Sequence, residues 1–291
     1  MRPFVTARKA ALLLGLAAAA ALVASVSLGS GNAAPSAATL SVRIRNHALD
    51  LSSHSLPAGR TTIRVTTAGR GEHGIIIARL NDGVTPARFK RALSTKNGLA
   101  ALSLASFRGG IDGQLTPGRT WQMITDLRPG LYVLADQGES ADKPNFDRGS
   151  IATLRVSQGS GQPEARPGPS GSIVMIDFAF RIHLPKSFHG RGWVKFENRG
   201  HALHRIILLR LFPGVSFAQA YAAVHAHDQR KQGPPPGQPV ELIGAVSPGF
   251  VGYLNVNLKP GRYIAACFEA DSQTGRVPHT ELGMIGRFTI S

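Results

Sequence analysis

Residues 258–284 read LKPGRYIAACFEADSQTGRVPHTELGM. This stretch opens on a Pro-Gly turn, continues as an apolar run that ends at Cys267, and then reaches His279 and Met284. A Pro-Gly dipeptide beside an apolar run is typical of a turn that leads into a strand. Thiolate, imidazole and thioether are soft ligands that select copper, and one Cys with two His and a weak Met makes a blue-copper site. The stretch therefore predicts β-structure with a candidate copper site at the end of a strand.

The same turn occurs earlier in the chain. LRPG at 127–130 with Tyr132 precedes LKPG at 258–261 with Tyr263 by 131 residues. The same offset relates further positions, namely Gly69 to Gly200, His73 to His204, Ile75-Ile76 to Ile206-Ile207, Gly83-Val84 to Gly214-Val215, and Gly113, Pro117 and Gly118 to Gly244, Pro248 and Gly249. Near the end the offset becomes 134, which pairs Pro144 with Pro278 and Gly149 with Gly283. A register kept over so many turn residues predicts a duplicated unit.

The two copies are separated by SQGSGQPEARPGPSG at 157–171, a Gly/Pro/Ser-rich stretch that is typical of a linker. The predicted organisation is a signal peptide at 1–34, a first repeat at 35–156, the linker, and a second repeat at 172–291. The signal peptide is predicted from a basic start, an apolar run from Ala10 to Leu28, and small residues at Ala33 and Ala34. An uncleaved membrane anchor is the alternative. After cleavage we expect an exported, extracytoplasmic protein with no transmembrane segment.

Each repeat has the pattern of an all-β unit with one short helix. In the first predicted strand, Leu40, Val42 and Ile44 alternate with polar residues, and Val174, Ile176, Phe178, Phe180 and Ile182 predict the same alternation in the second repeat. Thr85-Pro86 predicts an N-cap and first helical position, and Ser216 with Gln219 predicts a capping box. The predicted fold class is all-β, with two tandem antiparallel β-sandwiches.

The charge and composition of the chain limit its partners. The formal net charge is +16, and it is +13 without Arg2, Arg8 and Lys9 of the predicted signal peptide, which favours an acidic partner protein. The arginines are scattered and aromatic residues make up only 7% of the chain, so the sequence does not predict nucleic-acid binding. It does not indicate an oligomeric state.

Four residues of the second repeat form the candidate metal site. His204 begins an apolar strand, Cys267 ends one, and the segment that follows holds His279 and Met284. The spacing of Asn198, Gly200 and His204, the LKPG-x-Y turn, and then Cys267, His279 and Met284 resemble the cupredoxin pattern of plastocyanin and azurin. This resemblance implies cupredoxin-like sandwiches and one copper ion held by His204, Cys267, His279 and Met284. It also implies one-electron transfer or copper handling.

The chain departs from the small cupredoxins in the length of one loop. Eleven residues, Phe268 to Pro278, separate Cys267 from His279, whereas two to four are usual in the family, and longer loops occur in the type 1 sites of copper nitrite reductases. The first repeat keeps His73 but has Asp136, Asn145 and Ser150 at the other three positions, so we expect it to be free of copper.

Three of the four candidate ligands also have a purely structural interpretation, whereas His279, in a Pro-His pair within a polar loop, has no obvious role in a core. His204 fits a buried, hydrogen-bonded histidine, and Cys267 and Met284 fit core packing. The alternative function is therefore a metal-free cupredoxin-like binding or structural module. A copper oxidoreductase is disfavoured, because Cys267 has no adjacent histidine and only His225 and His227 form a His-x-His pair. Catalytic motifs of hydrolases are absent from the sequence, so we expect no enzyme activity.

Overall fold

The computed structural model describes residues 38–69, 71, 73–95, 98–111, 115, 117–140, 143–159, 165–225, 234–270 and 277–291. The predicted signal peptide at 1–34, His227 and part of the predicted linker lie outside these ranges. Within the described part of the chain, no helix combines the length and the apolar character needed to cross a membrane.

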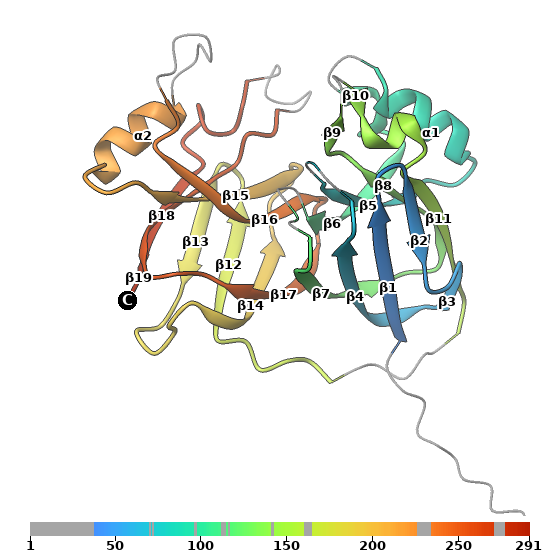
Figure 1. Ribbon diagram of the computed structural model, residues 1–291, viewed down its shortest axis with the longest axis horizontal. Coiled ribbons are helices and arrows are strands. Elements are labelled where there is room, and N and C mark those ends of the chain that lie inside the picture. The colour runs from blue at the N-terminus through green and yellow to red at the C-terminus, as the bar shows by residue number, and fades with distance from the viewer. Residues whose placement is uncertain are drawn as a thin grey trace, which may run out of the picture. The chain divides into compact units, whose positions relative to one another are not determined.

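The described chain is mostly β-structure, with strands concentrated in two stretches that we call the N-terminal half (38–157) and the C-terminal half (171–290) (Figure 1). The strands of the N-terminal half are β1 Ala38–Arg45, β2 Ala48–Leu51, β3 Ser55–Pro57, β4 Gly59–Thr67, β5 Ile75–Leu80, β6 Ala105–Ile111, β7 Thr120–Leu127, β8 Gly130–Asp136, β9 Glu139–Ser140, β10 Lys143–Pro144 and β11 Ile151–Ser157. Those of the C-terminal half are β12 Gly171–Ile176, β13 Ala179–His183, β14 Arg191–Asn198, β15 His204–Leu211, β16 Gly237–Val246, β17 Val251–Asn257, β18 Gly261–Ala266 and β19 Ile285–Ile290. The all-β prediction is thereby confirmed.

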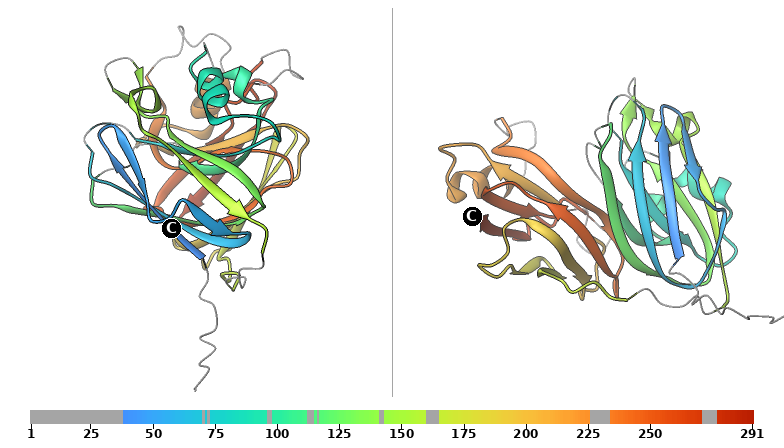
Figure 2. Two further views of the ribbon diagram at one scale, coloured as in Figure 1. Left: turned by 90° about the vertical axis from the view of Figure 1, so that its right-hand side faces the viewer. Right: turned by 60° about the horizontal axis from the view of Figure 1, so that its bottom comes forward.

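Two large sheets contain almost all of these strands, and each sheet runs through both halves. One has the order β13-β12-β14-β17-β7-β4-β1-β2, and the other β19-β18-β15-β16-β6-β5-β8-β11-β3. The halves join where β17 pairs with β7, over Tyr253 and Ile124, and where Val246 of β16 pairs with Arg108 of β6. Figure 1 shows β7 and β17 side by side at this junction, and Figure 2 shows it from two other sides.

The main hydrophobic core lies between the two sheets. It combines residues of the first sheet, such as Leu40 and Phe196, with residues of the second, such as Tyr132 and Tyr263. Both tyrosines are fully buried, and their hydroxyl groups donate to the carbonyl oxygens of Arg128 and Lys259. A hydrogen bond therefore links each Pro-Gly turn to the strand that follows it. This explains why the tyrosine accompanies the turn in both halves.

The alternation predicted for the first strand is confirmed, because Leu40, Val42 and Ile44 are buried and their neighbours are exposed. The corresponding prediction in the C-terminal half was wrong. The chain turns back after Ile176, and the side chains buried on β12 are Ile173 and Met175 instead of Val174 and Ile176. The turn between β12 and β13 contains two residues, an even number. The alternating pattern of the sequence therefore continues across the turn and does not reveal it.

Both predicted helices form with the predicted caps. Thr85 Oγ1 accepts a hydrogen bond from the Arg88 backbone at 3.2 Å, and Pro86 begins α1 (Pro86–Leu93). Ser216 Oγ accepts from the Gln219 backbone at 3.2 Å, while Gln219 Oε1 accepts from the Ser216 backbone at 2.8 Å, before α2 (Phe217–His225). Two short 3-10 helices, η1 Leu99–Ala101 and η2 Asn145–Arg148, complete the described elements.

Candidate metal centre

Three adjacent strands bring the candidate ligands to one place. His204 is the first residue of β15, Cys267 directly follows β18, and Met284 directly precedes β19. β18 pairs with β15 on one side and with β19 on the other. Because β18 runs antiparallel to both neighbours, the start of β15, the end of β18 and the start of β19 lie at the same end of the sheet.

His204, Cys267 and His279 form one buried group. His204 Nδ1 lies 3.1 Å from His279 Nδ1, and Cys267 Sγ lies 3.9 Å from His204 Nδ1 and 3.5 Å from His279 Nδ1. All three side chains have no exposed surface. Metal–nitrogen bonds of about 2.0 Å and metal–sulfur bonds of about 2.3 Å place donors of one ion roughly 3.3–4 Å apart. The observed spacing fits this requirement, and the three residues could hold one metal ion.

The loop before β15 fixes the position of His204. The buried Asn198 side chain donates to the carbonyl oxygens of Ala202 and Val246, and its Oδ1 accepts from the Gly200 backbone at 3.0 Å. A Cβ atom on Gly200 would lie 2.9 Å from His204 Nε2. Glycine is therefore required at position 200 for the imidazole to pack against the loop with its Nδ1 toward Cys267.

A backbone hydrogen bond compensates for the long segment between Cys267 and His279. The His279 backbone donates to the Glu269 carbonyl oxygen at 2.8 Å, so the chain returns to within one hydrogen bond of its starting point. The Glu269 side chain forms an ion pair with Arg205, the residue after His204. The extra length is thus confined to residues 270–278 and does not displace His279.

Met284 is fully buried beside this group. Its backbone donates to the His279 carbonyl oxygen at 2.9 Å, and its carbonyl oxygen accepts from the Cys267 backbone at 3.3 Å. The backbones of Cys267 and His279, two of the other three candidate ligands, are therefore hydrogen-bonded to the backbone of Met284. Met284 is thus adjacent to the other three positions. The donor atoms that lie within 4.8 Å of one another are those of His204, Cys267 and His279.

Burial controls the protonation of Cys267. Desolvation raises the pKa of the thiol to about 12, although the Arg205 backbone donates a hydrogen bond to Sγ at 3.4 Å. The side chain is therefore a neutral thiol at neutral pH in the metal-free protein. A cation within the group would favour the thiolate, because opposite charges at close range stabilise the ionised form.

The N-terminal half has the same backbone framework with different side chains. His73, Asp136, Asn145 and Ser150 are all buried, and His73 Nδ1 lies 2.7 Å from Asp136 Oδ2. The Asn145 backbone donates to the Gly138 carbonyl oxygen at 2.8 Å, as that of His279 does to Glu269. Asp136 Oδ1 accepts from the backbones of Gly74 and Gly138, both at 3.0 Å. A carboxylate with hydrogen-bond donors therefore occupies the place of the thiol.

Sequence reasoning missed the residues that surround the ligands, in particular Asp177, Phe178 and Arg205. The Phe178 ring contacts the His279 ring, and the Asp177 carboxylate bonds His201. The side chain of His201 is 88% exposed. A turn signature at 177–178 was not recognised, because Asp-Phe lacks the Gly or Asn that usually marks a two-residue hairpin.

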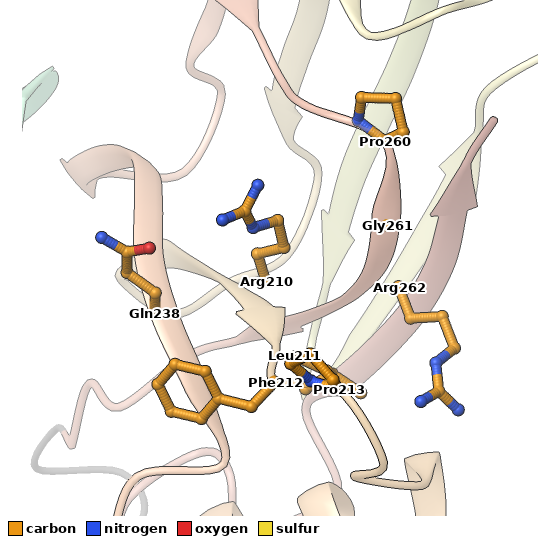
Figure 3. A pocket seen from close by; sticks show the side chains of 8 residues that line it. All are labelled: Arg210, Leu211, Phe212, Pro213, Gln238, Pro260, Gly261 and Arg262. Atoms are coloured by element: carbon orange, nitrogen blue, oxygen red, sulfur yellow. The ribbon is translucent and has the colours of Figure 1, made fainter.

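Two cavities lie on the C-terminal half or beside it. One, of about 340 Å³, is lined by Arg210, Arg262 and Phe212 among eight residues (Figure 3). Arg210 is six residues along β15 from His204, or about 20 Å. A second, of about 330 Å³, has Leu203, Arg205 and Glu269 on one side and apolar residues of the N-terminal half, including Leu99 and Phe146, on the other. The second cavity thus adjoins the metal centre and the first does not.

Comparison with protein-family models and with curated proteins gave no match. Among solved structures, the chain is similar to a dithionite-reduced auracyanin from the photosynthetic bacterium Roseiflexus castenholzii, with 19% identity over 42% of this chain and 98% of that one, at a TM-score of 0.29. It is also similar to auracyanin A, a blue copper protein from Chloroflexus aurantiacus, with 17% identity over 42% and 100% at 0.29. A copper nitrite reductase from Nitrosomonas europaea matches at 11% identity over 88% and 94%, at 0.23. Scores this low carry no argument about function, which depends on the residues of this chain.

Proposed function

We propose that this chain is an exported copper-binding protein that uses His204, Cys267, His279 and Met284 for one-electron transfer or copper handling. The observation that carries the proposal is the buried convergence of one thiol and two imidazole Nδ1 atoms within 4.8 Å of one another. A bound copper ion would carry one electron by changing between Cu(I) and Cu(II). Sulfur and imidazole ligands are the set that copper prefers, and Met284 stands where a weak fourth donor would be expected.

The chain's own residues would keep this site rigid and dry. His204 is fixed by the loop around Asn198, His279 by the Glu269 carbonyl oxygen, and Cys267 by the Arg205 backbone. Ligands held in place by the scaffold need little rearrangement when the charge of a bound ion changes. The absence of exposed surface on these ligands would also exclude water from the ion. Both properties favour electron transfer over substrate chemistry.

We infer that the two halves are tandem cupredoxin-like sandwiches, the first without a metal site. The support is the strand-by-strand correspondence, in which β4 and β14, β5 and β15, and β8 and β18 occupy equivalent positions in their halves. α1 and α2 likewise follow β5 and β15. We propose the domain boundaries 35–156 and 172–291, and their support is that β11 ends at Ser157 and β12 begins at Gly171.

The net charge supports an acidic redox partner. Removal of the proposed signal peptide leaves +13, and the arginines around the cavity in Figure 3 add positive charge to the C-terminal half. Opposite charge increases the association rate of electron-transfer partners, and the effect weakens as salt is added. We propose no catalytic residues, and no nucleic-acid partner.

One observation favours the alternative of a metal-free module. The N-terminal half shows that this backbone framework can close over a hydrogen-bonded network in which His73 and Asp136 lie 2.7 Å apart. In that case the thiol and imidazole groups of the C-terminal half would act as core residues, and added copper would leave the stability of the protein unchanged.

Redox titration of the copper-loaded protein tests electron transfer. We expect reversible one-electron reduction and reoxidation without loss of the ion. In Met284→Leu the potential should rise, because removal of a weak donor disfavours Cu(II) more than Cu(I), and each tenfold loss of relative Cu(II) affinity corresponds to about 59 mV. Met175→Leu, which changes a fully buried methionine on β12, is the matched control and should leave the potential unchanged. Equal shifts in the two variants, or irreversible loss of copper on reduction, would contradict the proposal.

A further inference from the structure

The turn between β12 and β13 has an unusual backbone conformation. Ile176 pairs with Ala179, so Asp177 and Phe178 alone form the turn. Phe178 has φ of +62°, and among the described residues it is the only one other than glycine with positive φ. A side chain larger than glycine is strained in this region and persists only where the surroundings enforce it, often at functional sites. The conformation therefore needs an explanation in what Phe178 contacts.

Phe178 packs on the candidate ligand His279. The two ring centroids are 5.0 Å apart with an interplanar angle of 73°, so the contact is edge-to-face. The His204 ring makes a contact of the same kind with His279, at 5.0 Å and 68°. His279, which follows a long loop, is thus held between a ligand and Phe178, and none of its surface is exposed.

Asp177 links the same turn to the loop before His204 through hydrogen bonds. Its carboxylate accepts a hydrogen bond from the His201 backbone at 2.6 Å and lies 2.8 Å from His201 Nδ1. A Cβ atom on Gly200 would lie 2.5 Å from Asp177 Oδ1, so the turn is packed directly against this loop. The turn therefore contacts His279 itself and the loop that positions His204.

The N-terminal half provides an internal comparison. Arg45 pairs with Ala48, and Asn46-His47 forms the equivalent two-residue turn. His47 is exposed, its φ is not positive, and no ring contact involves it among the described residues. The strained aromatic residue thus occurs only in the half that has the thiol and imidazole group.

We propose that Phe178 is a positioning residue for the metal centre. Its ring holds the His279 imidazole toward Cys267, and it closes the centre to solvent on the side of His279. This inference rests on the proposed function, and it adds that exchange of the ion with solvent is limited by the turn at 177–178. The strain at Phe178 is maintained because the ring contact and the Asp177 hydrogen bonds fix the turn.

Release of copper to an excess of a colourless chelator tests the proposal. Phe178→Gly removes the ring and also relieves the positive φ, so this variant should fold at least as well as the wild type. We expect it, and Phe178→Ala, to release copper about tenfold faster, which corresponds to the loss of one aromatic contact in a closed site. Their thiolate-to-copper absorption band should also shift, because His279 is less constrained. Phe178→Tyr, which keeps the ring, should restore the slow release.

Phe180→Ala is the matched control, because Phe180 lies on the same hairpin and packs near Gly286 of β19. Its release rate should stay within about twofold of the wild type. Equal rates for Phe178→Gly and Phe180→Ala would overturn the assignment. If the wild type shows no thiolate-to-copper band, the proposed function fails, and the seal is then judged in the metal-free protein. There, Ellman's reagent should modify Cys267 faster in Phe178→Gly than in Phe180→Ala, and equal rates would refute the seal.

Discussion

Cys267 combines two properties that conflict in the absence of a cation. It is fully buried, so its thiolate is disfavoured, yet it lies within 4 Å of two imidazole nitrogens that suit a shared ion. The usual fate of a lone buried cysteine is inert packing. The neighbouring His204 and His279 distinguish this thiol from such a residue, because core packing alone does not require imidazole nitrogens to converge on it.

The raised pKa of Cys267 predicts how the stability of the metal-free protein depends on pH. Desolvation raises the pKa from 9.0 to about 12, so above pH 9 the unfolded chain loses the thiol proton while the folded chain keeps it. The free energy of unfolding should therefore fall by about 1 kcal/mol for each pH unit above 9.

Urea denaturation at pH 8 and pH 10 measures this effect, with Cys267→Ser as the reference. The other titrating groups are common to both proteins, so the difference between them isolates the thiol. A wild-type protein that loses no more stability than Cys267→Ser over this range would show that the thiol is not held neutral by the fold.

The sequence located the candidate ligands because their chemistry is visible in residue types. Cys267, His279 and Met284 are rare residues close together in the sequence, and His204 follows from the offset of 131. The supports could not be predicted in the same way. Arg205 bonds Cys267 through its backbone, and the Glu269 carbonyl oxygen bonds His279, so neither interaction depends on a side-chain type that a sequence reveals.

At the scale of elements, the loop after β8 and the loop after β18 share a backbone closure and differ in length and in side chains. Each is closed by a backbone hydrogen bond, from Asn145 to Gly138 and from His279 to Glu269. The second loop is three residues longer between these points, which accounts for the change of offset from 131 to 134. The space at this end is closed by hydrogen bonds in the N-terminal half and offers candidate ligands in the C-terminal half, because the side chains there differ: His73, Asp136, Asn145 and Ser150 in the first, His204, Cys267, His279 and Met284 in the second.

The hydrogen-bonded network of the N-terminal half predicts a large effect of Asp136→Ala. The substitution would leave His73 Nδ1 and the backbones of Gly74 and Gly138 without their buried acceptor. Breaking a buried pair of this kind should lower the free energy of unfolding by about 3 kcal/mol.

Urea denaturation followed by circular dichroism provides the measurement, with Asp50→Ala as the control. Asp50 pairs with Arg45 at 2.6 Å on the surface, where both side chains are well exposed, so its loss should cost less than about 1 kcal/mol. Similar costs for the two variants would show that the buried network does not stabilise the N-terminal half.

Elements with local signals were predictable and those without were not. The caps at Thr85 and Ser216 depend on residues one to three positions apart, and both helices formed as expected. The turn at Asp177-Phe178 has no such signal, because its conformation is imposed by contacts with His201 and His279, which are distant in sequence. The missed turn and the proposed seal of the metal centre are therefore the same feature.

At the scale of the whole described chain, equivalent strands of the two halves pair with each other. β7 pairs with β17, and β6 with β16, so both sheets continue from one half into the other. The sequence indicated two copies and a linker, but strand patterns alone do not reveal which edges pair. The cavity bounded by Leu203, Arg205 and Glu269 on one side and by Leu99 and Phe146 on the other follows from this junction.

Visible absorption of the protein during titration with Cu(II), with Cys267→Ser beside it, tests the central claim most directly. An intense thiolate-to-copper band should grow until one equivalent is bound and should be absent from the variant, because the C-terminal half alone has a thiol and the N-terminal half is closed by Asp136. A colourless wild-type protein, or a band that survives the loss of Cys267, would contradict the assignment of a copper site to His204, Cys267, His279 and Met284.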